Sequence, residues 1–220
     1  MTRPDLTERL LLLGEGERGL LQDLYQARFA TPSVAEALAA LSGGSLGALE
    51  DGGFLKAVET AQGPVLYLSQ TGVRAALALL GPAQQSASRA YAALRLRHEL
   101  RRAELYVALR GRGMRAASYR AEPRLAYRSA AGLGPRTLVP DAQVAAPEGD
   151  ALIEVDLGTE GAAQLRHKWL RYREWQEDAP RRALYVLAAT PATVRDTLAS
   201  AGLVAHVAAD PPDLARAVWP

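Results

Sequence analysis

Apolar residues recur at helical spacing through the first fifty residues of the chain. Leucines between Leu10 and Leu24 follow the three- and four-residue spacing of an amphipathic helix, although Gly14 and Gly16 interrupt it. Thr31-Pro32-Ser33 has the composition of a helix start and predicts a second helix that runs to Leu41. Ser45–Asp51 predicts a third, short helix that ends at a pair of glycines.

A β-hairpin and one more helix complete this region. Residues 54–58 and 65–68 are β-like and are joined by a Gly-Pro turn, and a helix is expected over 71–80. This order resembles a winged helix, so we predict a winged-helix domain over residues 1–81. Such domains usually bind DNA through the third helix, but Ser45–Asp51 contains no basic residue. A dimerisation or partner-docking module is therefore the alternative.

Helical and strand-like patterns alternate in the rest of the chain. Gly81-Pro82 begins a short linker, and we predict a second domain over residues 88–220. Helices are expected over 88–110, 161–177 and 191–201, and strands over 115–120, 137–145, 151–157, 183–188 and 204–207. The resulting order, α-β-β-β-α-β-α, predicts an α/β fold in which helices flank a mixed sheet.

Charge is distributed unevenly, although the net charge is only +2. Residues 1–85 carry six basic and nine acidic side chains, and residues 86–220 carry 20 basic and 15 acidic ones. Within 86–128, eleven arginines stand against three glutamates, an excess that suggests a polyanionic partner. The side chains expected to bind DNA phosphates lie on the predicted 88–110 helix: Arg95, Arg97, His98, Arg101 and Arg102. A solvated polar helix face is the alternative.

Composition also restricts the cellular setting and the metal chemistry. The chain contains no cysteine, which excludes disulfides and thiolate metal sites. The N-terminus lacks the apolar segment of a signal peptide, and no apolar run reaches the roughly 18 residues of a membrane span. Only two of the 26 basic residues are lysine, a bias that is common in GC-rich genomes. We therefore expect a cytoplasmic, bacterial protein with no membrane partner.

Three carboxylates and one lysine form the most distinctive pattern in the chain. Asp141 lies in a predicted strand, Glu154 and Asp156 follow on the next strand, and Lys168 lies on the helix after that. Carboxylates at the ends of adjacent strands supply the hard oxygen ligands that Mg²⁺ requires. Because Mg²⁺ beside a phosphodiester promotes its cleavage, the pattern predicts a nuclease centre or the remnant of one.

This pattern resembles the core of the PD-(D/E)XK nuclease superfamily over about residues 88–190. The whole chain is also similar to the replication-relaxation family, in which a winged helix precedes such a nuclease-like domain. The motifs that carry the resemblance are Arg97-His98-Glu99-Leu100, Leu138-Val139-Pro140-Asp141, the segment from Ile153 to Thr159, and the segment from Gly161 to Tyr172. The resemblance implies plasmid replication and its control as the process and DNA as the partner. It also implies Mg²⁺ as the candidate cofactor, held by Asp141 and Glu154.

The chain departs from the usual superfamily pattern at Asp156, where a lysine normally assists the attacking water, although some members carry that lysine on the helix that follows. Lys168 replaces that lysine only if its side chain reaches the strand ends. The catalytic candidates are Asp141, Glu154, Asp156 and Lys168. Because of the departure, we expect a DNA-binding protein linked to replication or transcription control, with a degenerate nuclease-like domain. The alternatives are a Mg²⁺-dependent DNA endonuclease and a protein-interaction adaptor that uses the acidic winged helix; homodimerisation through the winged helix is a further expectation.

Overall fold

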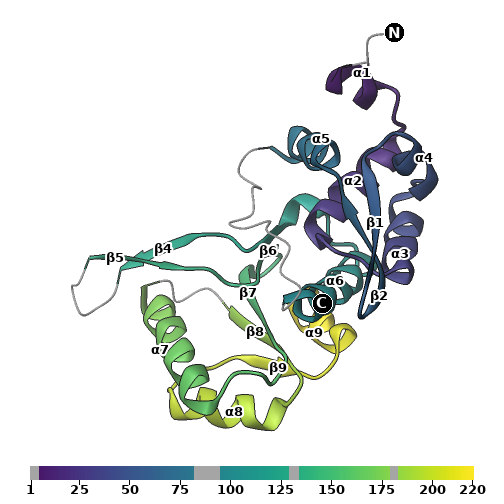
Figure 1. Cartoon of the computed structure of the whole chain (residues 1–220). Helices are drawn as coiled ribbons and strands as arrows, with labels where there is room; N and C mark the ends of the chain where they lie inside the picture. Colours follow the sequence, from purple (N-terminus) through teal and green to yellow (C-terminus); the bar gives the residue numbers. More distant parts are fainter. Residues whose placement is uncertain (1–4, 82–94, 129–133, 179–182) are drawn as a thin grey trace. The chain divides into compact units, whose positions relative to one another are not determined.

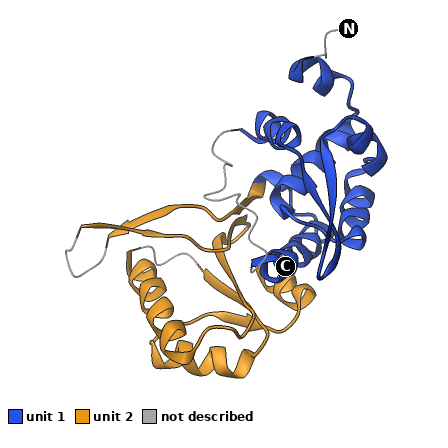
Figure 2. Cartoon of the chain, viewed as in Figure 1, with its two compact units in different colours: residues 1–85, 91–117 blue, residues 86–90, 118–220 orange. Residues whose placement is uncertain are grey.

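The computed structural model describes residues 5–81, 95–128, 134–178 and 183–220 (Figure 1). The chain divides into two compact units, of which unit 1 comprises residues 1–85 and 91–117, and unit 2 comprises 86–90 and 118–220 (Figure 2). Helices and strands occur in both units, and unit 2 contains a sheet with both parallel and antiparallel strand pairs. The predicted α/β class is therefore confirmed.

Unit 1 contains the helices and the hairpin in the order that the sequence predicts. Its first elements are α1 (Leu6–Leu11), α2 (Glu15–Ala27), α3 (Pro32–Ser42), α4 (Leu46–Asp51), the antiparallel strands β1 (Leu55–Thr60) and β2 (Gly63–Leu68), and α5 (Gln70–Leu80). Three of these helices begin at a hydroxyl side chain, because Thr31, Ser45 and Ser69 each accept a hydrogen bond from the backbone N–H three residues later. The predicted helix start at Thr31 is thus confirmed, and the structure adds the caps at Ser45 and Ser69.

Two glycines of unit 1 allow the backbone of one element to contact another directly. A Cβ atom on Gly16, in α2, would lie 2.2 Å from the carbonyl oxygen of Gly43, in the turn after α3. A Cβ atom on Gly72, in α5, would lie 2.2 Å from the carbonyl oxygen of Phe54. Any side chain at either position would overlap backbone atoms, so these contacts require glycine.

Helix α6 (Leu96–Gly111) also belongs to unit 1, where it packs against α2 and α3. Residues 88–94 of the predicted helix lie outside the described residues. The sequence pattern places this helix at the start of the second domain, whereas in the structure it is part of the first compact unit. A compact unit is defined by packing, but a domain is defined by independent folding, so the boundary near residue 81 stays a prediction.

Unit 2 is built on a five-stranded mixed sheet with the strand order β3-β6-β7-β8-β9. Its strands are β3 (Tyr119–Ala121), β6 (Ala142–Ala146), β7 (Gly149–Asp156), β8 (Ala183–Ala188) and β9 (His206–Ala208), and its helices are α7 (Ala162–Asp178), α8 (Pro191–Ser200) and α9 (Pro211–Val218). The first three strands pair antiparallel, and β7, β8 and β9 pair parallel. The predicted strand over 115–120 is shorter than expected, because residues 116–118 form a 3-10 turn.

The core of unit 2 lies between the sheet and two helices. Trp169 and Trp175 of α7 are fully buried and pack with Leu152 of β7 and Val186 of β8, together with apolar residues of α8. The predicted helix over 161–177 and the buried strand over 183–188 are thus confirmed. No helix within the described residues is long and apolar enough to cross a membrane.

A separate two-stranded ribbon differs from the sequence prediction. It consists of β4 (Leu125–Arg128) and β5 (Pro135–Leu138), which pair antiparallel. The pattern predicts one strand over 137–145, but the structure divides this segment between β5 and β6. Pro140 lies at the break and has no N–H to donate to a strand ladder, so the strand cannot continue through it.

Candidate functional site

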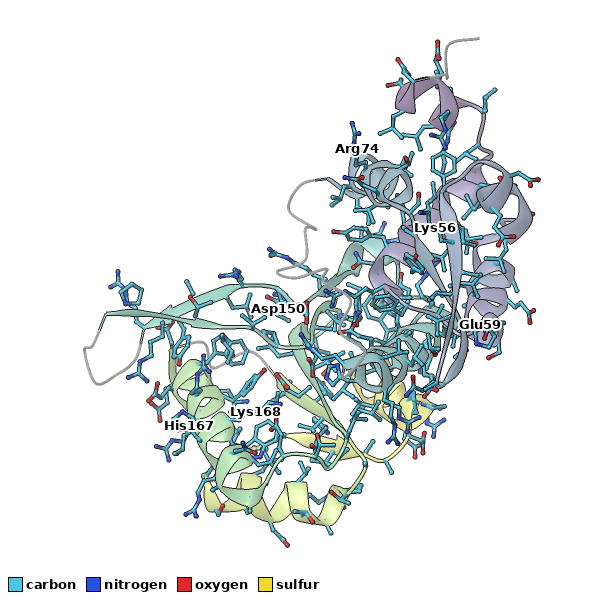
Figure 3. All side chains as sticks on the ribbon, viewed as in Figure 1. Lys56, Glu59, Arg74, Asp150, His167 and Lys168 are labelled. Carbon is cyan, nitrogen blue, oxygen red and sulfur yellow. The ribbon has the colours of Figure 1, made fainter. Side chains whose placement is uncertain are left out.

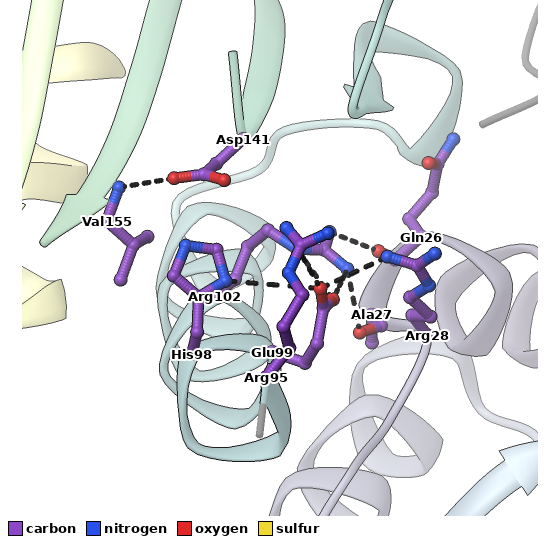
Figure 4. Close-up of polar contacts among 9 residues, drawn as sticks. All are labelled: Gln26, Ala27, Arg28, Arg95, His98, Glu99, Arg102, Asp141 and Val155. Carbon is purple, nitrogen blue, oxygen red and sulfur yellow. Dashed lines mark hydrogen bonds and ion pairs between the residues drawn. The ribbon is translucent and has the colours of Figure 1, made fainter. Parts of the chain in front are cut away.

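Asp141 and Glu154 are brought together by the pairing of β6 with β7. Asp141 directly precedes β6, and the register pairs its neighbour Ala142 with Ile153, the residue before Glu154. The backbone N–H of Val155 donates to Oδ2 of Asp141 at 2.7 Å (Figure 4). Both carboxylates are buried, with 8% of Asp141 and 3% of Glu154 exposed. The two predicted metal ligands are therefore neighbours in the structure.

Lys168 reaches these carboxylates from α7 (Figure 3). Its Nζ lies 2.6 Å from Oε2 of Glu154 and 3.8 Å from Oε2 of Glu160. The superfamily that the sequence resembles normally carries its lysine at the position of Asp156, on the strand. In this chain the helix supplies an amine to Glu154 instead.

Tyr172 also belongs to the site, although the sequence pattern assigns this residue only to helix packing. Its hydroxyl donates a hydrogen bond to Oε1 of Glu154. Tyr172 follows Lys168 by four residues, so both side chains project from the same side of α7. That spacing was the signal in the sequence for the second contact. Lys168 and Tyr172 together engage both carboxylate oxygens of Glu154.

Burial and like charge control the protonation of the site. Burial, and then the negative charge of Asp141, raise the pKa of Glu154 to about 7, although Lys168 and Tyr172 act in the opposite direction. Burial acts to lower the pKa of Lys168, but the charges of Glu154 and Asp141 outweigh it and raise that pKa. Burial, followed by the charge of Glu154, raises the pKa of Tyr172. At neutral pH, Lys168 is therefore an ammonium ion, and Glu154 is near its titration midpoint.

Asp156 lies close in sequence but makes different contacts. Its Oδ1 accepts a hydrogen bond from the N–H of Gly158 at 3.1 Å, and its Oδ2 is buried with no hydrogen-bond partner among the described residues. Asp156 shares a face of β7 with Glu154, because side chains two residues apart point to the same side of a strand. However, no group of three or more His, Asp or Glu side chains in the described part of the chain is arranged to hold a metal ion. The candidate centre thus comprises Asp141, Glu154, Lys168 and Tyr172.

A pocket of about 400 Å³ opens beside this centre, and we call it the α7 pocket. It is lined by Leu138, Val139, Glu154, Glu160, Gln164, His167, Lys168, Arg171 and Tyr172. Two of these side chains are basic, Lys168 and Arg171, and two carry carboxyl groups, Glu154 and Glu160. Of these lining residues, the sequence pattern predicts only Glu154 and Lys168 as functional residues.

The donor chemistry of the centre fits a divalent cation. Mg²⁺ commonly uses one or two carboxylates, together with water and a substrate phosphate, and Asp141 and Glu154 supply such a pair. In the structure, the ammonium of Lys168 contacts Oε2 of Glu154, so a metal ion bound to that oxygen would have to replace this contact. Binding of Mg²⁺ by Asp141 and Glu154 therefore stays a prediction, and it includes movement of Lys168.

Arg102, one of the predicted phosphate-binding residues, is fully buried within unit 1 (Figure 4). Its guanidinium donates to the backbone carbonyls of Gln26 and Ala27 and to Oε2 of Glu99, the last at 2.7 Å. Burial is tolerated because Glu99 neutralises the charge and the carbonyls satisfy the remaining N–H groups. Arg102 has no surface to present to a phosphate, so the structure does not support this part of the prediction.

The other predicted phosphate-binding residues differ in their exposure. The side chain of Arg95 is 48% exposed and lies 3.9 Å from Glu99, and the same carboxylate lies 3.9 Å from the imidazole of His98. Arg101 pairs with Glu104 at 2.6 Å and is about one-third exposed, and Arg97 is exposed. DNA contact by these four residues stays a prediction.

The family model of replication-relaxation proteins matches residues 21–186, about three quarters of the chain. The chain therefore belongs to the replication-relaxation family. No curated protein and no solved structure gives a significant match.

Proposed function

We propose that this protein binds DNA during replication and that its candidate centre engages a backbone phosphate through a divalent cation. The observation that supports this proposal is the proximity of Asp141, Glu154 and Lys168, of which Glu154 and Lys168 line the α7 pocket. The carboxylates of Asp141 and Glu154, where ionised, repel a phosphate placed beside them. A divalent cation between carboxylates and phosphate removes that repulsion.

The residues of the candidate centre would have different roles in this function. Asp141 and Glu154 would hold Mg²⁺, which, when bound, polarises a phosphoryl oxygen and lowers the pKa of a coordinated water. The N–H of Val155 fixes the carboxylate of Asp141, and the hydroxyl of Tyr172 fixes that of Glu154. Lys168, after the metal ion replaces its contact with Glu154, would supply a positive charge to the bound phosphate.

A second candidate function is Mg²⁺-dependent cleavage of DNA, and the contact between Lys168 and Glu154 favours it. The expectation of a degenerate centre rests on the absence of a lysine at Asp156. A lysine Nζ nevertheless lies 2.6 Å from Glu154, and a positive charge so placed can stabilise the charge that develops during phosphodiester hydrolysis. The proposal of DNA binding holds for both candidates, and catalysis separates them.

For the winged-helix segment of unit 1, we propose docking to a protein partner rather than to DNA. The surface of α4, the usual recognition helix, exposes Glu50 and Asp51 and carries no lysine or arginine. Acidic side chains repel a DNA backbone, so a basic protein surface or a second copy of the chain is the better match.

The experiment that tests the proposed function measures binding of a labelled duplex by fluorescence anisotropy in Ca²⁺ and in EDTA. Ca²⁺ binds the same oxygen ligands as Mg²⁺ and separates binding from cleavage. Ca²⁺ should tighten binding by wild type but not by Asp141→Asn, whose amide is a poorer metal ligand. Equal affinity in Ca²⁺ and EDTA would overturn the proposal.

A cleavage assay with Mg²⁺ or Mn²⁺ then separates the two candidates. Wild type that cuts DNA, together with Lys168→Met that binds in Ca²⁺ without cutting, would establish an endonuclease. Wild type that binds in Ca²⁺ but leaves DNA intact in both metals would establish a binding protein.

A further inference from the structure

The β4–β5 ribbon of unit 2 has one packed face and one open face. On the packed face, Tyr127 and Leu138 are only 2% and 4% exposed and belong to the core that contains Trp169. Glu174 of α7 contacts this face twice. It accepts a hydrogen bond from the hydroxyl of Tyr127, and it forms an ion pair with Arg136 at 2.7 Å. The ribbon is therefore held on α7 along its inner side.

Two backbone contacts complete this attachment. Arg171 of α7 donates from its guanidinium to the carbonyl oxygen of Thr137 at 2.7 Å. Near the other end of the ribbon, the N–H of Arg128 donates to Oδ2 of Asp178 at 3.2 Å. Both strands are thus fixed to one helix, so the open face has a defined direction relative to the α7 pocket.

The open face is formed by the alternate residues of both strands, and we call it the outer ribbon face. The register pairs Ala126 with Thr137 and Arg128 with Pro135, and all four residues are exposed. Continuing the alternation adds one residue on each strand. The outer ribbon face then comprises Arg124, Ala126, Arg128, Pro135, Thr137 and Val139, all of them exposed.

This face has the chemistry of a surface that binds a polyanion. Its only charged side chains are Arg124 and Arg128, and neither guanidinium is tied to a carboxylate within the described residues. They are four residues apart, a separation of about 13 Å along a strand. The small side chains between them let an extended backbone approach closely. A two-stranded ribbon of this kind also has the width that the DNA major groove accepts.

The outer ribbon face continues into the α7 pocket. Val139 belongs to the face and also lines that pocket, with Leu138 beside it. A DNA backbone that contacts Arg128 and Arg124 in turn therefore runs toward Lys168 and Glu154. Two of the eleven arginines in residues 86–128 are placed in this way beside the candidate centre.

We propose that the outer ribbon face is a DNA-contacting surface that directs the backbone of DNA into the α7 pocket. This inference rests on the proposed function and adds the surface that positions the substrate. Arg124 and Arg128 make the phosphate contacts, and the residues between them provide close approach. An acidic protein partner is the competing occupant, and the test includes it.

The test compares two double variants that remove the same charge from unit 2. Arg124→Ala/Arg128→Ala removes both arginines of the outer ribbon face. The control, Arg195→Ala/Arg216→Ala, removes two exposed arginines from α8 and α9, which lie away from the ribbon (Figure 1). Binding of a labelled duplex in Ca²⁺ is measured by anisotropy over a salt series.

The ribbon variant should bind about tenfold more weakly than wild type. The slope of log Kobs against log salt is negative, and it should become less steep by about 1.8, because each lost phosphate contact removes about 0.9 from its magnitude. The control should keep the wild-type slope. Thermal melts establish that the variants fold, and Arg124→Gln/Arg128→Gln replaces the alanine variant if its melting temperature is lower.

Three outcomes would overturn the inference. Equal losses in the ribbon and control variants would show that only net charge matters. A ribbon variant with wild-type affinity and slope would show that the face does not touch DNA. Competition by polyglutamate as strong as that by unlabelled DNA would assign the face to an acidic protein. Failure of the proposed function is distinct, because wild-type binding would then not respond to Ca²⁺ at all.

Discussion

The ammonium nitrogen of Lys168 lies 2.6 Å from Oε2 of Glu154, and the negative charge of Asp141 acts on both groups. Because Asp141 also raises the pKa of Glu154, this amine offsets a repulsion that the fold itself creates. Lys168 thus extends a positive charge from α7 to Glu154 on β7. The stability of unit 2 should therefore depend on the protonation and charge of three side chains.

Glu154→Gln should remove a pH dependence from the stability of unit 2. Burial, and then the charge of Asp141, raise the folded-state pKa of Glu154 from 4.5 to about 7. The folded state therefore binds this proton more tightly than the unfolded chain does. The resulting stabilisation is complete below pH 4.5 and is lost as the pH rises through about 7.

Urea unfolding of wild type and Glu154→Gln at about pH 5 and about pH 8 checks this expectation. Relative to the variant, wild type should lose stability on the order of a few kcal/mol across that range. A difference between the two proteins that stays constant with pH would contradict it.

Lys168→Met should destabilise unit 2 more at high pH than at low pH. At about pH 8 the change leaves two buried carboxylates without their cation, which costs about 3–5 kcal/mol. At about pH 5, Glu154 is protonated and less compensation is lost. Arg171→Met is the matched control, because Arg171 lines the same pocket but makes an exposed hydrogen bond to Thr137. Chemical unfolding at about pH 8 should show a larger loss of stability for Lys168→Met than for Arg171→Met. Equal losses would contradict a role for the Lys168 ion pair.

Glu99→Ala should destabilise unit 1 strongly. Glu99 is 3% exposed and accepts hydrogen bonds from Arg28 and Arg102, so its loss leaves the fully buried Arg102 without a counter-charge. Loss of one partner from such a buried pair costs about 3–5 kcal/mol. The double change Glu99→Met/Arg102→Met should recover much of this loss, because no charge is then left buried. Glu104→Ala, which breaks the half-buried pair with Arg101, should have a much smaller effect.

The same glutamate should make unit 1 sensitive to acid. Burial acts to raise the pKa of Glu99, but Arg102 and then Arg28 outweigh it and lower that pKa below 4.5. The folded state then binds this proton less tightly than the unfolded chain. The stabilisation is present above pH 4.5 and is lost as the pH falls through the lowered pKa. Acid titration of Glu99→Gln should show a smaller loss of unit 1 structure than wild type over that range.

Gly16→Ala and Gly47→Ala should change stability in opposite directions. A Cβ at Gly16 would lie 2.2 Å from the carbonyl oxygen of Gly43, so α2 must move, at a cost of about 1–3 kcal/mol. A Cβ at Gly47, within α4, would meet only the hydroxyl of Ser45 at 3.8 Å, and alanine there improves helix propensity by up to about 1 kcal/mol. Thermal melts that place both variants below wild type would show that α4 has a further requirement for glycine.

Local patterns predict the elements of this fold where side chains within one segment determine the structure. The hydroxyl caps at Thr31, Ser45 and Ser69 are visible in the sequence because each acts on a backbone N–H three residues away. The ribbon is missed because Leu138 and Val144 give the segment over 137–145 an apolar character that hides the break. Pro140 is the signal of that break, since proline rarely lies inside a strand.

The candidate site is predictable in its carboxylates but not in its neighbours. Asp141 directly precedes β6 and Glu154 lies on β7, so their proximity follows from the antiparallel pairing of these consecutive strands. The burial of Arg102 depends on carbonyl oxygens at the end of α2, 76 and 75 residues away, and on Glu99. Helical spacing alone groups Arg102 with the exposed Arg95, because the spacing carries no information about where α2 packs in the fold.

The location of the amine on α7 rather than on β7 has an evolutionary consequence. Once Lys168 compensates Glu154, selection no longer acts on position 156 for a positive charge, and a residue such as Asp156 becomes acceptable there. We expect selection to act on position 168 instead, and on the core residue beside it, Trp169, which packs α7 against the sheet. Among related chains, a lysine at position 168 and the absence of a lysine at position 156 should therefore be inherited together.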